Sequence, residues 1–380
     1  MTTQASASKS HEHRDAALDG LRGVAILSIL VLHYIVYPVI RADTGPFSSA
    51  VRALGIHLWS GVDLFFVLSG YFIASSLLHS RDGDGYFAGF AIRRAFRIVP
   101  LYLVLLAGWA ALNLAGAQSI LTADDYPAYA YATFTQNFFL ASTGRYGGDL
   151  MAATWSLAIE VQFYALIPFL VRRLDTRAIA AAALAIAAAS VAARGFFPYP
   201  ASYSLPFCRC DALFAGVAIA AASHGPHGAA LHDWVRAHTR WIVAAAVAAY
   251  ALGAWFHPQP GSMHSHALFA AAFSSVVLCV VAAPKDTIAK LFSRGWLIWL
   301  GQASYGIYLF HYGVLSAVFI LAEGGAPKMQ GAAGLALIAL ALAATLLLCQ
   351  ALRRTIELPA INAGRTLATR RTRSTQAVGT

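Results

Sequence analysis

The stretch LDGLRGVAILSILVLHYIVY, residues 18–37, decides the class of fold. It is a mostly apolar run, and roughly 20 such residues in a helix cross the hydrocarbon core of a bilayer. It also carries Arg22 and His33, two side chains that are costly to place in a membrane. Similar apolar runs recur as far as residue 352, separated by short polar connections. The stretch is therefore predicted to be the first of several transmembrane helices.

Composition supports a membrane protein over its whole length. Of the 380 residues, 59% are hydrophobic and 12% are Asp, Glu, Lys or Arg, about half the ~25% charged fraction of a soluble protein. A soluble enzyme is excluded. We predict an all-α, polytopic membrane protein with about ten transmembrane helices. The predicted spans are 21–40, 56–79, 98–117, 151–171, 178–194, 205–222, 240–257, 265–283, 296–322 and 331–352.

The basic residues predict the orientation of these spans. The chain has 27 Lys and Arg against 17 Asp and Glu, a balance that nucleic acid, anionic lipid or an anionic substrate could explain. With a cytoplasmic N-terminus, 21 of the 27 fall in cytoplasmic segments and five in outer ones, as the positive-inside rule requires. The orientation of the spans in the membrane thus accounts for the excess of basic residues, and no nucleic-acid partner is expected. We predict a cytoplasmic tail over 1–20, a membrane domain over 21–352 and a basic cytoplasmic tail over 353–380.

Arg22 and His33 are eleven residues apart, about three helical turns, so they share one helix face. The spacing is roughly 16 Å along the axis, which places Arg22 at the cytoplasmic boundary and His33 near the bilayer centre. Burial favours a neutral imidazole, so His33 could act as a base or nucleophile. A buried histidine that only bonds a neighbouring helix is the alternative.

Two carboxylates could orient this imidazole. Asp63 lies in GVDLFFVLSGYFI (61–73) and Glu160 in WSLAIEVQFYALIP (155–168), and a carboxylate beside a histidine is a common catalytic arrangement. Either could instead pair with an arginine or stay neutral. Arg209 and Asp211 are expected to form an internal ion pair with each other.

Further candidates lie on two other spans. Arg94 and Arg97 in FAIRRAFRIVP (90–100) are neighbours on one helix face beside Arg93, and guanidinium groups suit phosphate recognition. These arginines could instead be only the positively charged residues that flank the cytoplasmic end of the third span. The span WLIWLGQASYGIYLFHYGVL (296–315) carries Tyr305 and His311, which could line the same cavity or only pack.

Two other features are interpreted from composition. The aromatic connection 118–150 is expected to cap an outward-facing cavity. No metal site is expected. Three histidines, His257, His264 and His266, are assigned to an outer loop.

Together these segments resemble the acyltransferase 3 family of integral membrane acyltransferases, whose bacterial members O-acylate surface polysaccharides, lipopolysaccharide and some macrolides. A basic residue followed by ten residues and a histidine, as in Arg22 to His33, is a family motif, and Arg-x-x-Arg, as in Arg94 to Arg97, is another. The resemblance is carried by LDGLRGVAILSILVLHY (18–34), GVDLFFVLSGYFI (61–73), RRAFRIVPLY (93–102), TWSLAIEVQFYALIP (154–168), RCDALFAG (209–216) and SYGIYLFHY (304–312).

The resemblance implies roles for these residues. It implies that His33 is catalytic, with Glu160 and Asp63 supporting the site. It implies an acyl-CoA donor, acetyl-CoA foremost, that is a co-substrate rather than a bound cofactor. The residues expected to bind the donor are Arg22, Arg93, Arg94 and Arg97. The residues expected to line the cavity are Tyr305, His311, Trp155 and Ser156, with Tyr305 or a backbone donor as the candidate oxyanion partner.

The implied function is O-acyl transfer in a bacterial inner membrane, from cytoplasmic acyl-CoA to a hydroxyl of an extracytoplasmic carbohydrate such as O-antigen or exopolysaccharide. His33 would act as general base or carry the acyl group itself. The short segment after the last span predicts that no appended esterase-like domain follows, so the membrane unit or a separate partner would complete the transfer. The alternatives are acylation of a macrolide or small glycosylated metabolite, and a non-enzymatic exporter.

Overall fold

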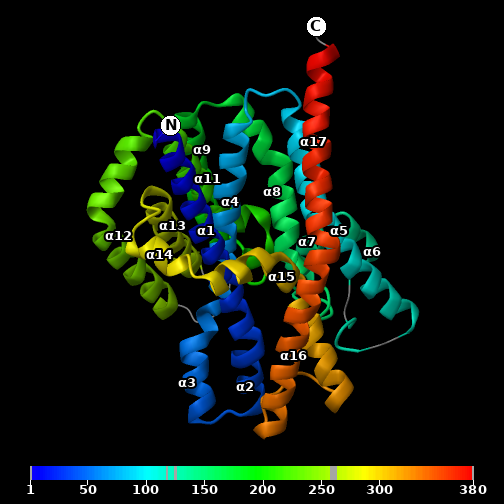
Figure 1. Cartoon of the computed structure of the whole chain (residues 1–380). Coiled ribbons are helices and arrows are strands. Elements are labelled where there is room, and N and C mark those ends of the chain that lie inside the picture. The colour runs from blue at the N-terminus through cyan, green and yellow to red at the C-terminus, as the bar shows by residue number, and fades with distance from the viewer. Residues whose placement is uncertain (1, 117–118, 124–125, 257–262, 379–380) are drawn as a thin grey trace.

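The computed structural model describes residues 2–116, 119–123, 126–256 and 263–378, and Figure 1 shows them as a bundle of α-helices. Ten helices within these residues are long and apolar enough to cross a membrane. Each coincides with one predicted span, so the all-α, ten-span prediction is confirmed. Residues 117 and 257, predicted ends of the third and seventh spans, lie outside the described residues. The spanning segments are Arg14–Ala42, Pro46–His79, Tyr86–Leu114, Thr154–Arg173, Thr176–Arg194, Ala201–His224, Gly228–Phe256, His264–Ala282, Gly295–Glu323 and Gly331–Thr369.

The helical elements often extend past the predicted spans. The expected N-terminal tail is helical from Thr2, and the segment after residue 352 continues as a helix through a π-helical turn. In chain order the elements are α1 (Thr2–Val31), η1 (Leu32–Val36), α2 (Tyr37–Ala42), α3 (Pro46–Gly55), η2 (Ile56–Ser60), α4 (Gly61–His79), α5 (Tyr86–Leu114), α6 (Ala128–Ala132), α7 (Gln136–Thr143), α8 (Thr154–Arg173), α9 (Thr176–Arg194), α10 (Ala201–Ser204), α11 (Pro206–His224), α12 (Gly228–Phe256), α13 (Met263–Ala282), α14 (Thr287–Phe292), α15 (Gly295–Glu323), α16 (Gly331–Leu352), η3 (Arg353–Glu357) and α17 (Leu358–Val378).

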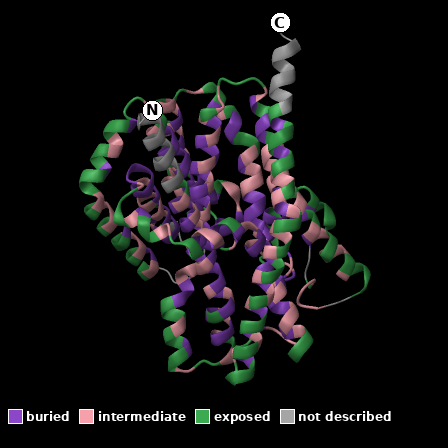
Figure 2. Ribbon diagram, in the orientation of Figure 1, coloured by how far each residue is buried: buried purple, intermediate pink, exposed green. Residues whose placement is uncertain are grey.

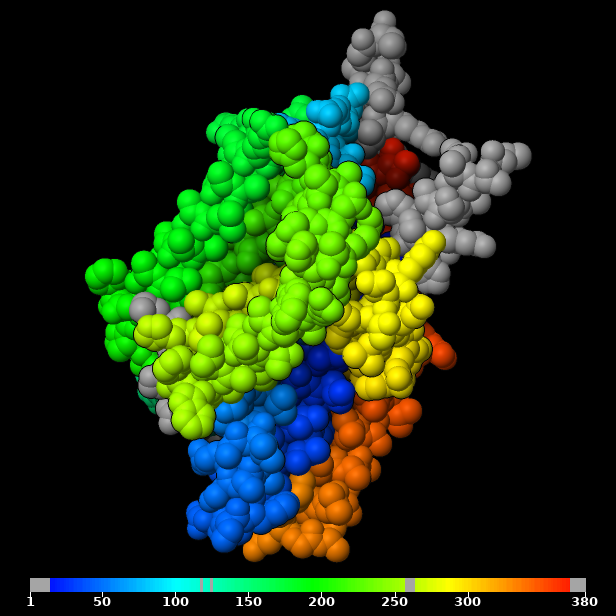
Figure 3. All heavy atoms as spheres, turned by 90° about the vertical axis from the view of Figure 1, so that its left-hand side faces the viewer, coloured from blue at the N-terminus to red at the C-terminus, as the bar shows by residue number. Residues whose placement is uncertain are grey.

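The bundle has a buried interior and an apolar outer surface. Buried residues gather on α1, α4 and α11 in Figure 2, whereas α12 is exposed along most of its length. Figure 3 shows α12 lying across one face of the bundle, and it packs against α13. An exposed helix this apolar needs lipid around it. The arrangement is that of a multi-pass membrane protein. The first described turn of α1 and the last of α17 lie toward the same end of the bundle in Figure 1, as an even number of spans requires.

Glycines set the spacing of the helices that carry the predicted site. A Cβ placed on Gly23 of α1 would lie 2.1 Å from the carbonyl oxygen of Leu297, and one on Gly301 of α15 would lie 1.8 Å from that of Asp19. Only glycine permits such contact between two backbones, and small residues at crossings are typical of membrane helices. The close crossing holds α1, which carries Arg22 next to Gly23, directly against α15, which carries His311 further along.

Candidate active site

Among the described residues, two neighbouring cavities inside the bundle share part of their walls. The larger, about 580 Å³, is lined by most of the predicted arginines, and we call it the arginine cavity. The smaller, about 270 Å³, is lined by His33 and His311, and we call it the histidine cavity. Val62 and Tyr308 line both cavities. A ligand extending from one cavity to the other would therefore pass these two side chains.

The arginine cavity is strongly cationic. Its lining carboxylates are Asp19 and Glu160. No described carboxylate side chain lies within 4.0 Å of Arg93 or Arg94. Uncompensated guanidinium groups in a cavity favour a polyanionic ligand. Six arginines line it: Arg22, Arg93, Arg94, Arg97, Arg353 and Arg365.

Aromatic rings hold these guanidinium groups in place. Arg94 lies 5.7 Å over the ring of Phe90 and 5.9 Å over that of Tyr164. Arg97 lies 5.9 Å over Tyr305 and forms a 2.8 Å ion pair with Glu357 of η3. Stacking of this kind favours arginine over lysine. The predicted i, i+3 pair is thus oriented, and part of the charge of Arg97 is balanced by Glu357.

Glu160 lines the arginine cavity rather than the histidine cavity. Its Oε1 accepts hydrogen bonds from the hydroxyls of Ser69, at 2.5 Å, and Tyr164. These two hydrogen bonds fix the orientation of the Glu160 carboxyl group. The prediction that Glu160 supports the site stays a prediction, and its position places it beside the arginines.

His33 lies on the π-helical turn η1, within hydrogen-bond distance of His311 on α15. Single π-turns inside α-helices are frequent at functional sites. His33 Nδ1 and His311 Nε2 are 2.9 Å apart. The hydroxyl of Tyr34, next to His33, donates to the carbonyl of His311 at 2.7 Å. His33 and Tyr34 are adjacent in η1, and both contact His311. These two contacts fix η1 against α15.

The surroundings of His311 determine which nitrogens carry protons. Its Nδ1 lies 3.2 Å from the carbonyl oxygen of Ile307 and 2.8 Å from that of Tyr308, and carbonyls only accept. Nδ1 of His311 is therefore protonated, so Nε2 of the neutral ring accepts from Nδ1 of His33. This assignment leaves Nε2 of His33 unprotonated, the state that a general base or nucleophile requires.

Aromatic side chains form most of the remaining wall of the histidine cavity. Rings of this kind suit stacking on a sugar, and their hydroxyl and indole groups can hydrogen-bond. Trp155, predicted to line a cavity, is among them, whereas Ser156 lines the arginine cavity and bonds the Tyr308 hydroxyl at 2.6 Å. The aromatic lining consists of Tyr37, Trp59, Tyr146, Trp155, Tyr199, Tyr203, Tyr308 and Tyr312.

Asp149 supplies the histidine cavity with its lining carboxyl group. It lies in the connection before α8, accepts a hydrogen bond from Ser316 and is 9% exposed. Burial raises the pKa of Asp149 to about 6, although the Ser316 hydroxyl acts in the opposite direction. The expected capping role of 118–150 stays a prediction, and residues 118, 124 and 125 lie outside the described residues.

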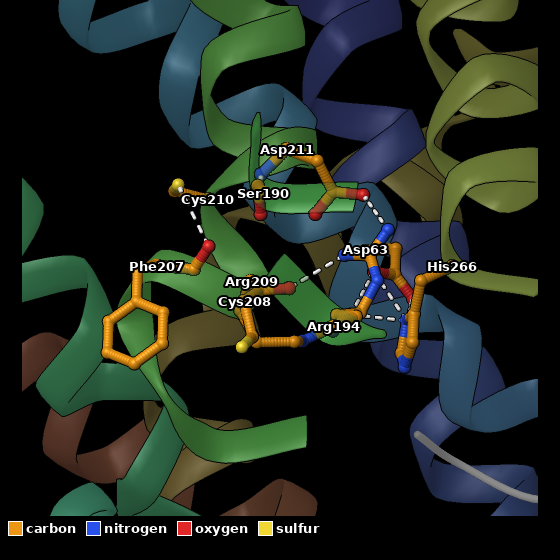
Figure 4. Close-up of polar contacts among 9 residues, drawn as sticks. All are labelled: Asp63, Ser190, Arg194, Phe207, Cys208, Arg209, Cys210, Asp211 and His266. Atoms are coloured by element: carbon orange, nitrogen blue, oxygen red, sulfur yellow. Dashed lines mark hydrogen bonds and ion pairs between the residues drawn. The ribbon is translucent and has the colours of Figure 1, made fainter. Parts of the chain in front are cut away.

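Asp63 belongs to a buried ion cluster behind the histidine cavity, drawn in Figure 4. Arg209 Nη1 lies 2.9 Å from its Oδ1, and His266 Nδ1 lies 3.3 Å from the same atom. The expected pair between Arg209 and Asp211 was wrong, since Asp211 pairs at 2.8 Å with Arg194 of α9. Side chains of α4, α9, α11 and α13 are brought together here, which local spacing cannot predict. That Asp63 supports the chemistry of His33 stays a prediction.

The cluster also corrects the assignment of two histidines. His264 and His266 belong to α13 rather than to an outer connection, and His266 is completely buried. The ring of His266 lies 4.6 Å from that of Trp59, and Arg209 lies 5.1 Å over the ring of Tyr203. The cluster thus supports two rings that line the histidine cavity. His257 lies outside the described residues.

The predicted residues therefore fall into three places. His33, His311 and Trp155 share the histidine cavity, and Asp63 lies in the ion cluster. Sequence reasoning missed Asp149, Tyr308 and His266. The aromatic richness of 118–150 was the available signal for Asp149, and none pointed to the other two. The arginine cavity holds Arg22, Arg93, Arg94, Arg97, Glu160, Ser156 and Tyr305.

Within the described residues, a cationic cavity thus meets a histidine cavity inside a membrane bundle. The family model described as an acyltransferase domain matches residues 15–354. The chain belongs to this acyltransferase family, which confirms the resemblance seen in the sequence.

Relatives of the chain are named as O-acetyltransferases. "Putative peptidoglycan O-acetyltransferase YrhL" of Bacillus subtilis (strain 168) is 27% identical over 84% of this chain and 51% of its own length. Peptidoglycan O-acetyltransferase OatA of Listeria monocytogenes is 25% identical over 90% of this chain and 55% of its own. The chain thus spans about half the length of these relatives. No solved structure matches the chain.

Proposed function

We propose that the protein is a membrane O-acyltransferase that moves an acetyl group from acetyl-CoA to a hydroxyl of a carbohydrate. One observation carries the proposal: the arginine cavity and the histidine cavity share Val62 and Tyr308 as wall residues. A polyanionic donor in the first cavity could therefore extend its thioester past these side chains to His33. The acceptor would approach from the opposite side.

The donor follows from the charge of the arginine cavity. Coenzyme A carries its phosphates at the nucleotide end and its thiol at the end of a long, uncharged pantetheine arm. Six arginines suit the phosphates. The axial distance from Arg22 to His33, roughly 16 Å, is one that an extended arm can bridge. We infer that the nucleotide binds among the arginines and that the arm reaches the histidine cavity.

The chemistry follows from the tautomer of His33. Its Nε2 takes the proton of the acceptor hydroxyl while the hydroxyl oxygen attacks the thioester carbonyl. The C–O bond forms, the C–S bond breaks, and the CoA thiolate receives the proton from His33. The same Nε2 could instead attack the thioester, so that an N–C bond forms, the C–S bond breaks and the CoA thiolate leaves; the acceptor hydroxyl then takes the acyl group from Nε2, and its proton goes to the thiolate. In both routes His311 holds His33 in the required tautomer, and Tyr308 at the shared wall is a candidate donor to the oxyanion.

The acceptor follows from the lining of the histidine cavity. Its rings and the Asp149 carboxyl offer stacking surfaces and hydrogen bonds for a sugar. Two relatives are named for peptidoglycan, so a peptidoglycan or other surface glycan is the proposed acceptor. A small glycosylated metabolite would use the same features, and the experiment below includes one.

We also propose a bacterial plasma-membrane location with both termini and the arginine cavity on the cytoplasmic side. The excess of basic residues in the corresponding segments supports this orientation. Acetyl-CoA is a charged cytoplasmic metabolite, so this orientation gives it access to the arginines. The histidine cavity then opens toward the side on which surface glycans lie.

Proteoliposomes test the function and the sidedness together. Radiolabelled acetyl-CoA is supplied only to the side of the arginine cavity, and peptidoglycan fragments, surface polysaccharide or a glycosylated macrolide only to the other. The proposal predicts label on a carbohydrate acceptor and one free CoA thiol per acyl group transferred. An exporter would leave acetyl-CoA intact, and label on the macrolide alone would replace the glycan as acceptor.

A further inference from the structure

The helix that follows the matched family region lines the arginine cavity. Residues 15–354 match the acyltransferase domain, whereas α17 begins at Leu358. Four residues of α17 line the cavity: Leu358, Ile361, Asn362 and Arg365. Their spacing is i, i+3, i+4 and i+7, which is one continuous face of an α-helix. An entire helical face, rather than a single side chain, is thus directed at the cavity.

Specific contacts fix α17 in this place. A Cβ on Gly364 would lie 2.5 Å from the Cβ of Phe96 on α5, so the two helices touch at a glycine. The ion pair between Glu357 of η3 and Arg97 of α5 lies at the start of α17, and the Glu357 side chain is 2% exposed. Both contacts lie beside the Arg93–Arg97 segment. They hold the lining face of α17 next to the predicted phosphate-binding arginines.

Arg365 is the lining residue of α17 that lies farthest along the chain. It follows Leu358 by seven residues, roughly 10 Å along the helix axis. Helix α16 continues through η3 into α17, which extends away from the α2 and α3 end of the bundle in Figure 1. Along this continuous helix, Arg365 lies twelve residues beyond Arg353, on the side away from α16. Its side chain is exposed, and it forms no ion pair with a described carboxylate.

We propose that α17 completes the donor site and that Arg365 binds the ribose 3′-phosphate of acyl-CoA. The inference rests on the proposed function. A donor whose thioester reaches His33 keeps its nucleotide end nearest the entrance of the arginine cavity. The inner arginines are then placed for the pyrophosphate, and the outermost arginine for the 3′-phosphate. Asn362, one turn earlier, can hydrogen-bond the ribose or adenine.

Binding of CoA and of 3′-dephospho-CoA to the full-length protein in nanodiscs tests the inference, with calorimetry as the readout. One charge-assisted hydrogen bond is worth ~1.5 kcal/mol or more, so Arg365→Ala is expected to weaken CoA binding about tenfold. The same variant should bind 3′-dephospho-CoA as the wild type does. Arg173→Ala, at the exposed end of α8 outside the cavity lining, is the matched control and should bind both ligands normally.

Nanodisc composition separates a donor phosphate from a lipid phosphate. The measurements are made in phosphatidylcholine alone and with added phosphatidylglycerol. An effect of Arg365→Ala that follows the lipid rather than the 3′-phosphate would overturn the inference, as would equal weakening of both CoA forms. If the wild type binds CoA and Arg365→Ala binds it equally well, the role of Arg365 is refuted while the proposed function stands. Failure of the wild type to bind CoA at all would refute the proposed function itself.

Discussion

His33 Nδ1 lies 2.9 Å from His311 Nε2, and these residues are 278 positions apart in the sequence. The two carbonyl oxygens at His311 Nδ1 determine the direction of this hydrogen bond. We propose that His311 is a positioning residue, which keeps Nε2 of His33 unprotonated and available for the chemistry.

Replacing His311 should lower turnover without changing donor binding. His311→Phe removes the acceptor for His33 Nδ1, so His33 loses its fixed tautomer and orientation. We expect kcat to fall and the KM for acetyl-CoA to stay near the wild-type value. His311→Gln, whose side-chain oxygen can accept the same hydrogen bond, should recover part of kcat. Steady-state thiol release measures both constants, and an unchanged kcat in His311→Phe would exclude the positioning role.

Replacing Arg94 should raise the KM for acetyl-CoA, whereas replacing His311 should lower kcat. Its guanidinium is stacked on Phe90 and Tyr164 and has no carboxylate partner among the described side chains. Loss of one charged hydrogen bond to a phosphate is expected to raise the KM for acetyl-CoA roughly 10- to 100-fold. Arg94→Lys should restore little, since lysine lacks the planar fork. If the KM of Arg94→Ala for acetyl-CoA equals that of the wild type, Arg94 does not bind the donor and serves only as a positive charge at the end of the span.

Removing the Asp63 carboxylate should destabilise the fold. Asp63→Asn leaves the Arg209 guanidinium buried without its charge partner, and breaking a buried pair in this way costs about 3–5 kcal/mol. Thermal unfolding in detergent should show a clear loss. Asp233→Asn, which breaks the exposed pair with Arg236, is the control and should change stability by less than ~1 kcal/mol. If Asp63→Asn is as stable as the wild type but has lost turnover, Asp63 has a chemical role instead.

Asp149 predicts a pH dependence of stability. Its pKa is raised from an ordinary value of 3.8 to about 6, so the folded state favours the protonated form. Its contribution is fully present below pH ~4 and is lost as the pH rises through about 6. A shift of this size corresponds to on the order of 3 kcal/mol. The free energy of unfolding of the wild type should exceed that of Asp149→Asn by a margin that shrinks across this range. Parallel pH curves for the two proteins would contradict the assignment.

The ten spans could be predicted because each is a local property of the sequence. A run of about 20 apolar residues is long enough to cross the bilayer whatever its neighbours are. The same locality made the arginine group predictable, since Arg93, Arg94 and Arg97 are adjacent on one helix. The polar start of α13 concealed His266, because the run His264, Ser265 and His266 resembles a polar loop.

Pairings between distant helices could not be predicted. Arg209 and Asp211 are two residues apart, so they point to different sides of α11 and pair with α4 and α9 respectively. The contact between His33 and His311 depends on the glycine crossing of α1 and α15, where Gly23 and Gly301 touch the opposite backbones. Such contacts are set by helix packing, which a hydropathy pattern does not contain.

We propose that Nε2 of His33 takes the proton of an acceptor hydroxyl as that hydroxyl attacks the thioester. Thiol release from acetyl-CoA by the purified protein in lipid, with and without a surface glycan, tests it most directly when wild type and folded His33→Ala are compared. General base catalysis contributes ~100-fold or more, so release that requires the glycan and falls by at least this factor in the variant is predicted. Equal release by both proteins, or intact acetyl-CoA with every acceptor, would contradict it.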